Sequence, residues 1–179
     1  MRFGLNTVYV TRMNETIVMG IDPGSQCTGW GIVAERSGVL KLVACGTVRG
    51  RGDEFDIRIG RIFTDLHTIL ARHKPLEAAI ENVFAGKSAA SALKLGQARG
   101  AAIAACAALN IPVHSYEPTK IKQALVGTGR ADKAQVSFMV SRLLDCKADW
   151  SVDAGDALAV AICHLNTRRL NMLAERGKT

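Results

Sequence analysis

Three short apolar runs open the chain before any stretch with helical periodicity, and this order limits the folds available to it. The runs are Thr16–Ile21, Trp30–Arg36 and Leu40–Arg49, all rich in Val, Ile or Leu with Gly or Ser at the breaks. They predict three β-strands joined by short turns. Helical and β-type segments then alternate along the chain. Hairpins followed by this alternation predict an α/β fold with a five-stranded mixed sheet and helices on both faces.

The segments after the third strand have the periodicities that such a fold needs. Residues Glu54–His73 place apolar side chains at spacings of three and four, which is typical of an amphipathic helix that ends before Pro75. The further predicted elements are a strand, a helix, a strand and three helices, at Leu76–Val83, Ser88–Leu109, Ile111–Tyr116, Thr119–Val126, Ala131–Leu144 and Val152 to beyond Leu165. In the Ala-rich helix, Gly96 and Gly100 share one face, where another element can approach closely.

The length and composition fit one domain. With 179 residues, 48% of them hydrophobic, the chain can bury a substantial core. We predict a single domain at 16–173, an N-terminal extension at 1–15 that could be disordered, and a tail at 174–179. No apolar run approaches the ~18 to 20 residues of a membrane span. Five widely spaced cysteines without a CxxC pair indicate reduced thiols in a cytoplasmic protein.

An excess of basic residues narrows the classes of partner. The chain has 23 Lys and Arg against 16 Asp and Glu, a net charge of +7. This charge favours a polyanionic partner, either nucleic acid or an acidic membrane surface. Charge alone does not choose between the two.

Four acidic residues stand where packing alone does not explain them. Asp22 ends the first apolar strand just before a Gly-rich turn, and Glu81 closes the apolar strand AAIE. Asp153 and Asp156 are three residues apart at the start of the last helix, so they share a face. Each acid has an ordinary alternative explanation: a turn residue, an exposed strand end, or a favourable interaction with the helix dipole.

Together these acids describe one arrangement, in which two carboxylates end neighbouring strands and two come from a helix beside them. Carboxylates clustered without His or Cys favour hard cations such as Mg²⁺ or Mn²⁺ over Zn²⁺. Two such ions ~4 Å apart can activate a water molecule and stabilise the leaving 3′ oxygen in phosphodiester hydrolysis. The residues therefore predict a metal-dependent phosphodiesterase.

The segments around the acids resemble those of RuvC-type Holliday junction resolvases, which have a ribonuclease H-like fold. The matching motifs are GIDPGSQCTGWG, AIENVF, SALKLGQARG, KQALVG and DAGDALA, and the resemblance runs from about Thr16 to Leu165. It implies an Mg²⁺-dependent endonuclease, with two ions in each active site and Mn²⁺ as a substitute. The residues that it implies as catalytic and metal-binding are Asp22, Glu81, Asp153 and Asp156.

The resemblance also implies a substrate and partners. Members of the family act as homodimers that nick two opposing strands of a four-way DNA junction, in recombination and repair. They leave 5′-phosphate and 3′-hydroxyl ends and work with the RuvA–RuvB branch-migration complex. The helix that begins near Ser88 supplies much of the dimer interface in the family, which agrees with the small-residue face at Gly96 and Gly100.

Five residues are predicted to contact DNA. By the resemblance, Phe84 stacks on a base at the junction centre, a contact worth ~1 to 3 kcal/mol; the alternative is a core Phe. Lys122 and Lys133 match phosphate-binding lysines of the family. Lys87 and Arg130 stand on Gly-containing loops and are added to this set.

Some features have no counterpart in the resemblance. Gly155 stands where Ala is more usual in the family, and the N-terminal extension is atypical. His114 and His164 receive no family role, and His164 is expected to be a core or boundary residue because its helix is apolar.

Three other readings of the chain compete with the resolvase. The Gly-rich turn also resembles the first phosphate loop of the actin, Hsp70 and sugar kinase superfamily, but that architecture needs two lobes and a longer chain. A non-catalytic junction-binding module would not need four acids. A YqgF-type resolvase is shorter and lacks the SALKLGQARG helix in this form.

Overall fold

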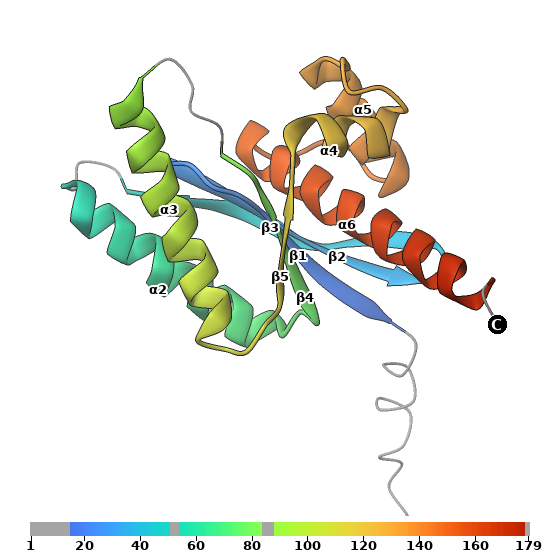
Figure 1. Cartoon of the computed structure of the whole chain (residues 1–179), viewed down its shortest axis with the longest axis horizontal. Helices are drawn as coiled ribbons and strands as arrows, with labels where there is room; N and C mark the ends of the chain where they lie inside the picture. Colours follow the sequence, from blue (N-terminus) through green and yellow to red (C-terminus); the bar gives the residue numbers. More distant parts are fainter. Residues whose placement is uncertain (1–14, 51–53, 84–87, 178–179) are drawn as a thin grey trace, which may run out of the picture.

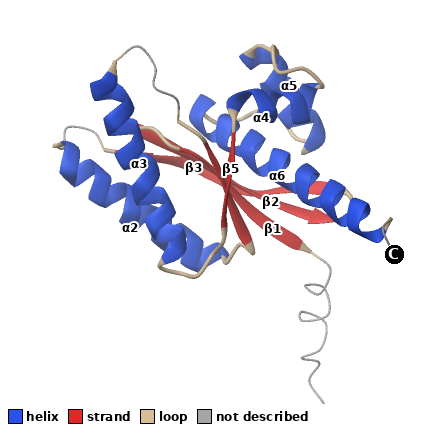
Figure 2. Ribbon diagram, in the orientation of Figure 1, coloured by secondary structure: helices blue, strands red, loops and turns tan. Residues whose placement is uncertain are grey.

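A five-stranded sheet lies between two layers of helices in the computed structural model, which describes residues 15–50, 54–83 and 88–177 (Figure 1). Figure 2 separates the strands from the helices that cover them. The elements are β1 (Thr16–Asp22), β2 (Cys27–Arg36), β3 (Val39–Arg49), α2 (Phe55–His73), β4 (Glu77–Glu81), α3 (Ala89–Ala107), β5 (Val113–Tyr116), α4 (Pro118–Val126), α5 (Lys133–Leu143) and α6 (Val152–Arg176). The α/β class and the five-stranded sheet are confirmed.

The strand order is β3-β2-β1-β4-β5, and the directions make the sheet mixed as predicted. β1, β2 and β3 form antiparallel pairs, whereas β4 runs parallel to β1 and β5 runs parallel to β4. The turn between β2 and β3 consists of Ser37 and Gly38, which both have positive φ. Two such residues make the tight turn whose twist suits a hairpin.

Two hydrophobic cores occupy the two faces of the sheet. Met19, Ile21 and Ile80 point to the face covered by α2 and α3. Val18 and Ala79 point to the opposite face, which α6 covers, with α4 and α5 packed against α6. This division follows from the alternation of side chains along a strand. Within the described part of the chain, no helix has the length and hydrophobicity to cross a bilayer.

Several element boundaries differ from the predicted ones, among them the start of β5, the start of α5 and the end of α6. β5 starts at Val113 rather than Ile111, because the N–H of Ile111 donates to the Cys106 carbonyl at the end of α3. α5 starts after Asp132, whose side chain caps the helix by accepting from the N–H of Gln135. α6 continues to Arg176, three residues beyond the domain end predicted at 173. Residues 1–14 of the predicted extension lie outside the described residues.

Candidate active site

Two carboxylates lie side by side where neighbouring parallel strands end. Asp22 is the last residue of β1, and Glu81 is the last residue of β4. The pairing of Ile21 with Ile80 places the two acids at the same level of the sheet. Both side chains belong to the face that α6 covers, and both are half-buried. The carboxyl ends of parallel strands are where open α/β sheets build their sites.

Glycines on β1 and β2 allow the start of α6 to lie directly on these strand ends. A Cβ atom on Gly29 would lie 1.9 Å from the carbonyl oxygen of Asp153, and one on Gly20 would lie 2.0 Å from that of Ala157. Any side chain at either position would therefore push the helix away from the sheet. This role was not predicted from the sequence, where its signal was the alternation of Gly29 and Gly31 in strand β2.

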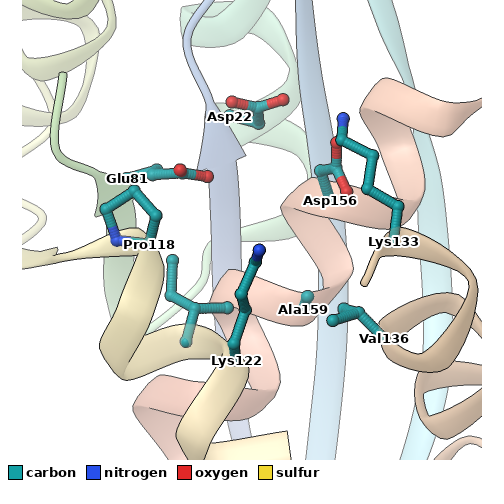
Figure 3. A pocket seen from close by; sticks show the side chains of 9 residues that line it. Asp22, Glu81, Pro118, Lys122, Lys133, Val136, Asp156 and Ala159 are labelled. Carbon is teal, nitrogen blue, oxygen red and sulfur yellow. The ribbon is translucent and has the colours of Figure 1, made fainter. Parts of the chain in front are cut away.

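Figure 3 shows Asp22, Glu81 and Asp156 around one space, on three different elements. They line a cavity of about 190 Å³. Two lysines reach the same cavity: Lys122 from α4 and Lys133 from the first turn of α5. The ammonium of Lys133 lies 3.1 Å from Oδ2 of Asp156. Carboxylate groups thus line the cavity together with the ammonium groups of two lysines.

The electrostatics of the cavity disfavour negative charge. Burial, followed by the charges of Glu81 and Asp156, raises the pKa of Asp22 to about 7. Burial and the charge of Asp156 also raise the pKa of Glu81. The hydrogen bond and charge of Asp156 raise the pKa of Lys133. A bound cation would favour the ionised forms of both acids, so this donor set fits a hard divalent ion such as Mg²⁺.

Asp153 occupies a different environment from the other three acids. It lies in the first turn of α6, three residues before Asp156, but it does not line the cavity. Its Oδ2 accepts a hydrogen bond from the Cys27 thiol over 3.0 Å. Burial, together with the hydrogen bond to Asp153, raises the pKa of Cys27, so the thiol keeps its proton at neutral pH. Cys27 was not predicted as a site residue because β2 was expected to start only at Trp30.

A hydrogen-bond network fixes the chain just after Glu81. The side-chain amide of Asn82 donates to Oε1 of Glu117 over 2.7 Å. The guanidinium of Arg99 donates to Oδ1 of Asn82 over 3.0 Å and to the hydroxyl of Ser115 over 2.6 Å. These contacts tie β4 to α3, to β5 and to the start of α4. None of these residues stood out in the sequence, because their partners lie 16 to 35 positions away.

Three of the five predicted DNA-binding residues lie in the described part of the chain. Lys122 and Lys133 lie on the cavity, and Arg130 is exposed on the loop before α5. Phe84 and Lys87 lie outside the described residues. Gly96 and Gly100 are exposed on α3, and no other element of the described chain approaches them within 4 Å. The expectation of a close neighbour at this face is therefore not met within the described part of one chain.

Comparison with known proteins finds a consistent set of similarities. The family described as crossover junction endodeoxyribonuclease RuvC matches residues 18–164. A crossover junction endodeoxyribonuclease RuvC from Oleidesulfovibrio alaskensis is 68% identical over 157 residues, which are 88% of this chain and 95% of the relative. The RuvC structure from Thermus thermophilus is 34% identical, with a TM-score of 0.81 over 87% of this chain and 97% of that one. RuvC from Thermus thermophilus in complex with Holliday junction substrate gives 34% identity and a TM-score of 0.82 over 87% and 96%.

Proposed function

This chain belongs to the RuvC family of crossover junction endodeoxyribonucleases and has its ribonuclease H-like fold, and on that premise we propose how its residues act. It resolves four-way DNA junctions by paired symmetric nicks, in homologous recombination and DNA repair. The observation that carries this proposal is the cavity where Asp22, Glu81 and Asp156 lie together with two lysines. Such a cavity can bind cations and the phosphates of a DNA strand at once.

We assign the acids to the binding of divalent cations. Asp22, Glu81 and Asp156 would hold Mg²⁺ between the strand ends and α6, with Mn²⁺ as a substitute. Asp153 would complete the set from the first turn of the same helix, held in place by the thiol of Cys27. Two bound Mg²⁺ ions would supply an activated water and charge stabilisation at the leaving 3′ oxygen, giving 5′-phosphate and 3′-hydroxyl products.

The basic residues are assigned to the DNA backbone. Lys133 neutralises Asp156, while its own side chain stays 75% exposed and can reach a phosphate. Lys122 lies across the same cavity on α4. Arg130 and Lys87 would extend this contact along the strand. Phe84, three positions after Glu81, would stack on a base at the centre of the junction.

The oligomer proposed is a homodimer that meets through α3. One face of this helix packs on α2 and is buried, with Ala98 and Ala102 on it. The other face carries Leu93, which is 65% exposed, together with Gly96 and Gly100. An apolar side chain beside small residues allows a second copy of the helix to approach closely. Two active sites then act on opposing strands of one junction.

Three further assignments follow from the family. The RuvA–RuvB complex is the proposed partner in branch migration, and the cytoplasm, where the DNA substrate is found, is the proposed location. One nuclease domain that starts at residue 16 is proposed, with the extension at 1–15 outside it; the end predicted at 173 moves to Arg176, where α6 ends.

A cleavage assay tests the activity. The wild-type protein should nick a synthetic four-way junction at paired positions with Mg²⁺, without ATP, and should leave it uncut with chelator. Asp22→Asn should bind the junction without cutting it, and binding should weaken steeply with salt because phosphate contacts dominate. Equal cutting of linear duplex, or cutting in chelator, would refute the proposal.

A further inference from the structure

A second group of potential metal ligands lies at the other end of strand β4. It consists of Glu77, His114 and His164, from β4, β5 and α6. A carboxylate oxygen of Glu77 and one ring nitrogen of each histidine all lie within 4.8 Å of one another. None of these side chains lines the cavity of the candidate active site.

The fold brings these residues together by the same alternation that builds the active site. Glu77 and Glu81 are four positions apart on one face of β4, a distance of ~13 Å along a strand. Asp156 and His164 are eight positions apart on α6, ~12 Å along a helix. Because the two spacings agree, Asp156 lies near Glu81 at one end of β4, and His164 lies near Glu77 at the other end. Pairing of Ala79 with His114 then adds the second histidine from β5.

The contacts within this group are specific. Nε2 of His164 lies 2.6 Å from Oε2 of Glu77, and Nε2 of His114 lies 3.3 Å from the same oxygen. Nδ1 of His164 lies 2.7 Å from the hydroxyl of Tyr116. Nε of Arg168 donates to the other carboxylate oxygen, Oε1, over 3.1 Å. One oxygen of Glu77 therefore faces both imidazoles, while the other is held by the arginine.

We propose that Glu77, His114 and His164 bind a divalent transition-metal ion of the zinc class. Two imidazole nitrogens and one carboxylate oxygen are a donor set that suits Zn²⁺, in contrast to the all-oxygen set of the active site. The side chain of His114 is 45% exposed, so the ion can enter and a water molecule can take the fourth position. The site is independent of the nuclease activity proposed above.

The residues around His164 hold its ring in an orientation that suits a metal ligand. Its side chain is 3% exposed, and each of its two ring nitrogens has a hydrogen-bond partner. In the tautomer that donates from Nε2 to the Glu77 carboxylate, Nδ1 accepts from the hydroxyl of Tyr116. When a metal takes the Nε2 lone pair, the proton moves to Nδ1 and donates to Tyr116. A partner on the second ring nitrogen fixes the orientation of a metal-binding imidazole.

A zinc titration against a competing chromogenic chelator tests the proposal. It is carried out on Asp22→Asn protein, so that binding at the active-site carboxylates is weakened and does not mask the result. One equivalent of Zn²⁺ should bind, and binding should raise the unfolding temperature. Adding His114→Ala, which removes an exposed ring, should weaken the affinity at least ~10-fold and abolish the thermal shift.

Two further variants make the result specific. His67→Ala, in a histidine of α2 on the other side of the sheet, should leave zinc binding unchanged. Tyr116→Phe should weaken binding by ~10-fold while all three ligands remain. The proposal would be overturned if the protein took no zinc from the chelator. It would also be overturned if the proteins with and without His114 bound zinc equally. Because no DNA is present, the result is separate from that of the cleavage assay.

Discussion

The carboxyl group of Asp22 lies where burial and its acidic neighbours all disfavour the ionised form. Its pKa of about 7 lies well above the ordinary value of 3.8. The folded protein therefore binds this proton more tightly than the unfolded chain does, and ionisation lowers the stability of the metal-free fold. That loss is absent below the ordinary pKa, grows as the pH rises towards about 7, and is complete above it.

Because ionisation of Asp22 lowers the stability of the metal-free fold, we predict that Asp22→Asn stabilises the metal-free protein. At about pH 8 the variant should exceed the wild type by roughly 2 kcal/mol in free energy of unfolding, and the gain should shrink towards about pH 4. Urea unfolding in chelator, repeated across this range, measures it. Asp65→Asn, in an exposed acid of α2, is the control and should show little gain. A gain for Asp22→Asn that is largest at acid pH would contradict the assignment.

Cys27 offers a second prediction at the scale of one residue. Cys27→Ala removes the hydrogen bond that holds Asp153, so cleavage should need several-fold more Mg²⁺. Cys27→Ser keeps a donor and should need less Mg²⁺ than Cys27→Ala. The measurement is the Mg²⁺ concentration at half-maximal junction cleavage. Cys45→Ala, on β3, is the control. Identical curves for all variants would leave Cys27 without a role in positioning Asp153.

At the scale of elements, the contact between α6 and the sheet decides where the acids lie. β1 and β2 present glycines to this helix, and its backbone occupies the space that side chains would take. At Gly20 and Gly29 the nearest atoms of α6 are backbone carbonyl oxygens, which cannot rotate aside as a flexible side chain could. The position of Asp156 over the strand ends thus depends on glycines of β1 and β2 that do not line the cavity.

Gly29→Ala should therefore damage both stability and cleavage. The new methyl group would meet the carbonyl of Asp153, so the first turn of α6 must shift, with a loss of ~1 to 3 kcal/mol. Gly60→Ala, in α2 with nothing within 4 Å, should instead stabilise the fold by ~0.5 to 1 kcal/mol. Thermal unfolding and the junction assay measure both variants. A Gly29→Ala protein as stable and active as wild type would show that α6 adapts freely.

The elements were largely predictable because each has a local cause. Helix α2 follows from apolar spacing, and the hairpin follows from a Ser-Gly turn between β-type runs. The strand-end positions of Asp22 and Glu81 followed in the same way. The separation of Asp153 from the cavity did not, because it depends on how α6 is rotated against β2. The group of Glu77, His114 and His164 also escaped prediction, since it depends on the order and register of the strands.

The molecule as a whole is basic, although three acidic side chains line its cavity. The net charge of +7 favours the DNA backbone, and the acids would act only over the short distance to the cations that they are proposed to bind. One chain offers one such cavity lined by Asp22, Glu81 and Asp156, whereas paired nicks need two. The exposed face of α3 is where the proposed second chain would meet the first.

Leu93→Arg should convert the proposed dimer to a monomer. The charge would be buried between two helices without a partner, which is costly at an interface centre. Light scattering after size-exclusion chromatography measures the mass. Val39→Arg, at an equally exposed apolar residue of β3, should leave the mass unchanged. An unchanged mass for Leu93→Arg, or a monomeric wild type, would place the interface elsewhere or remove it.

The burial of α6 also has a kinetic consequence. From Ala157 to Leu165 every side chain of this helix is buried, and strands pack on one side with α4 and α5 on the other. Amide hydrogens in that stretch can exchange with deuterium only when the whole domain opens, so they should be among the last to exchange. Asp156 lies at the edge of this protected stretch. Its carboxylate is therefore attached to a segment that we expect to unfold only with the whole domain. Local unfolding of neighbouring loops should leave this carboxylate in position.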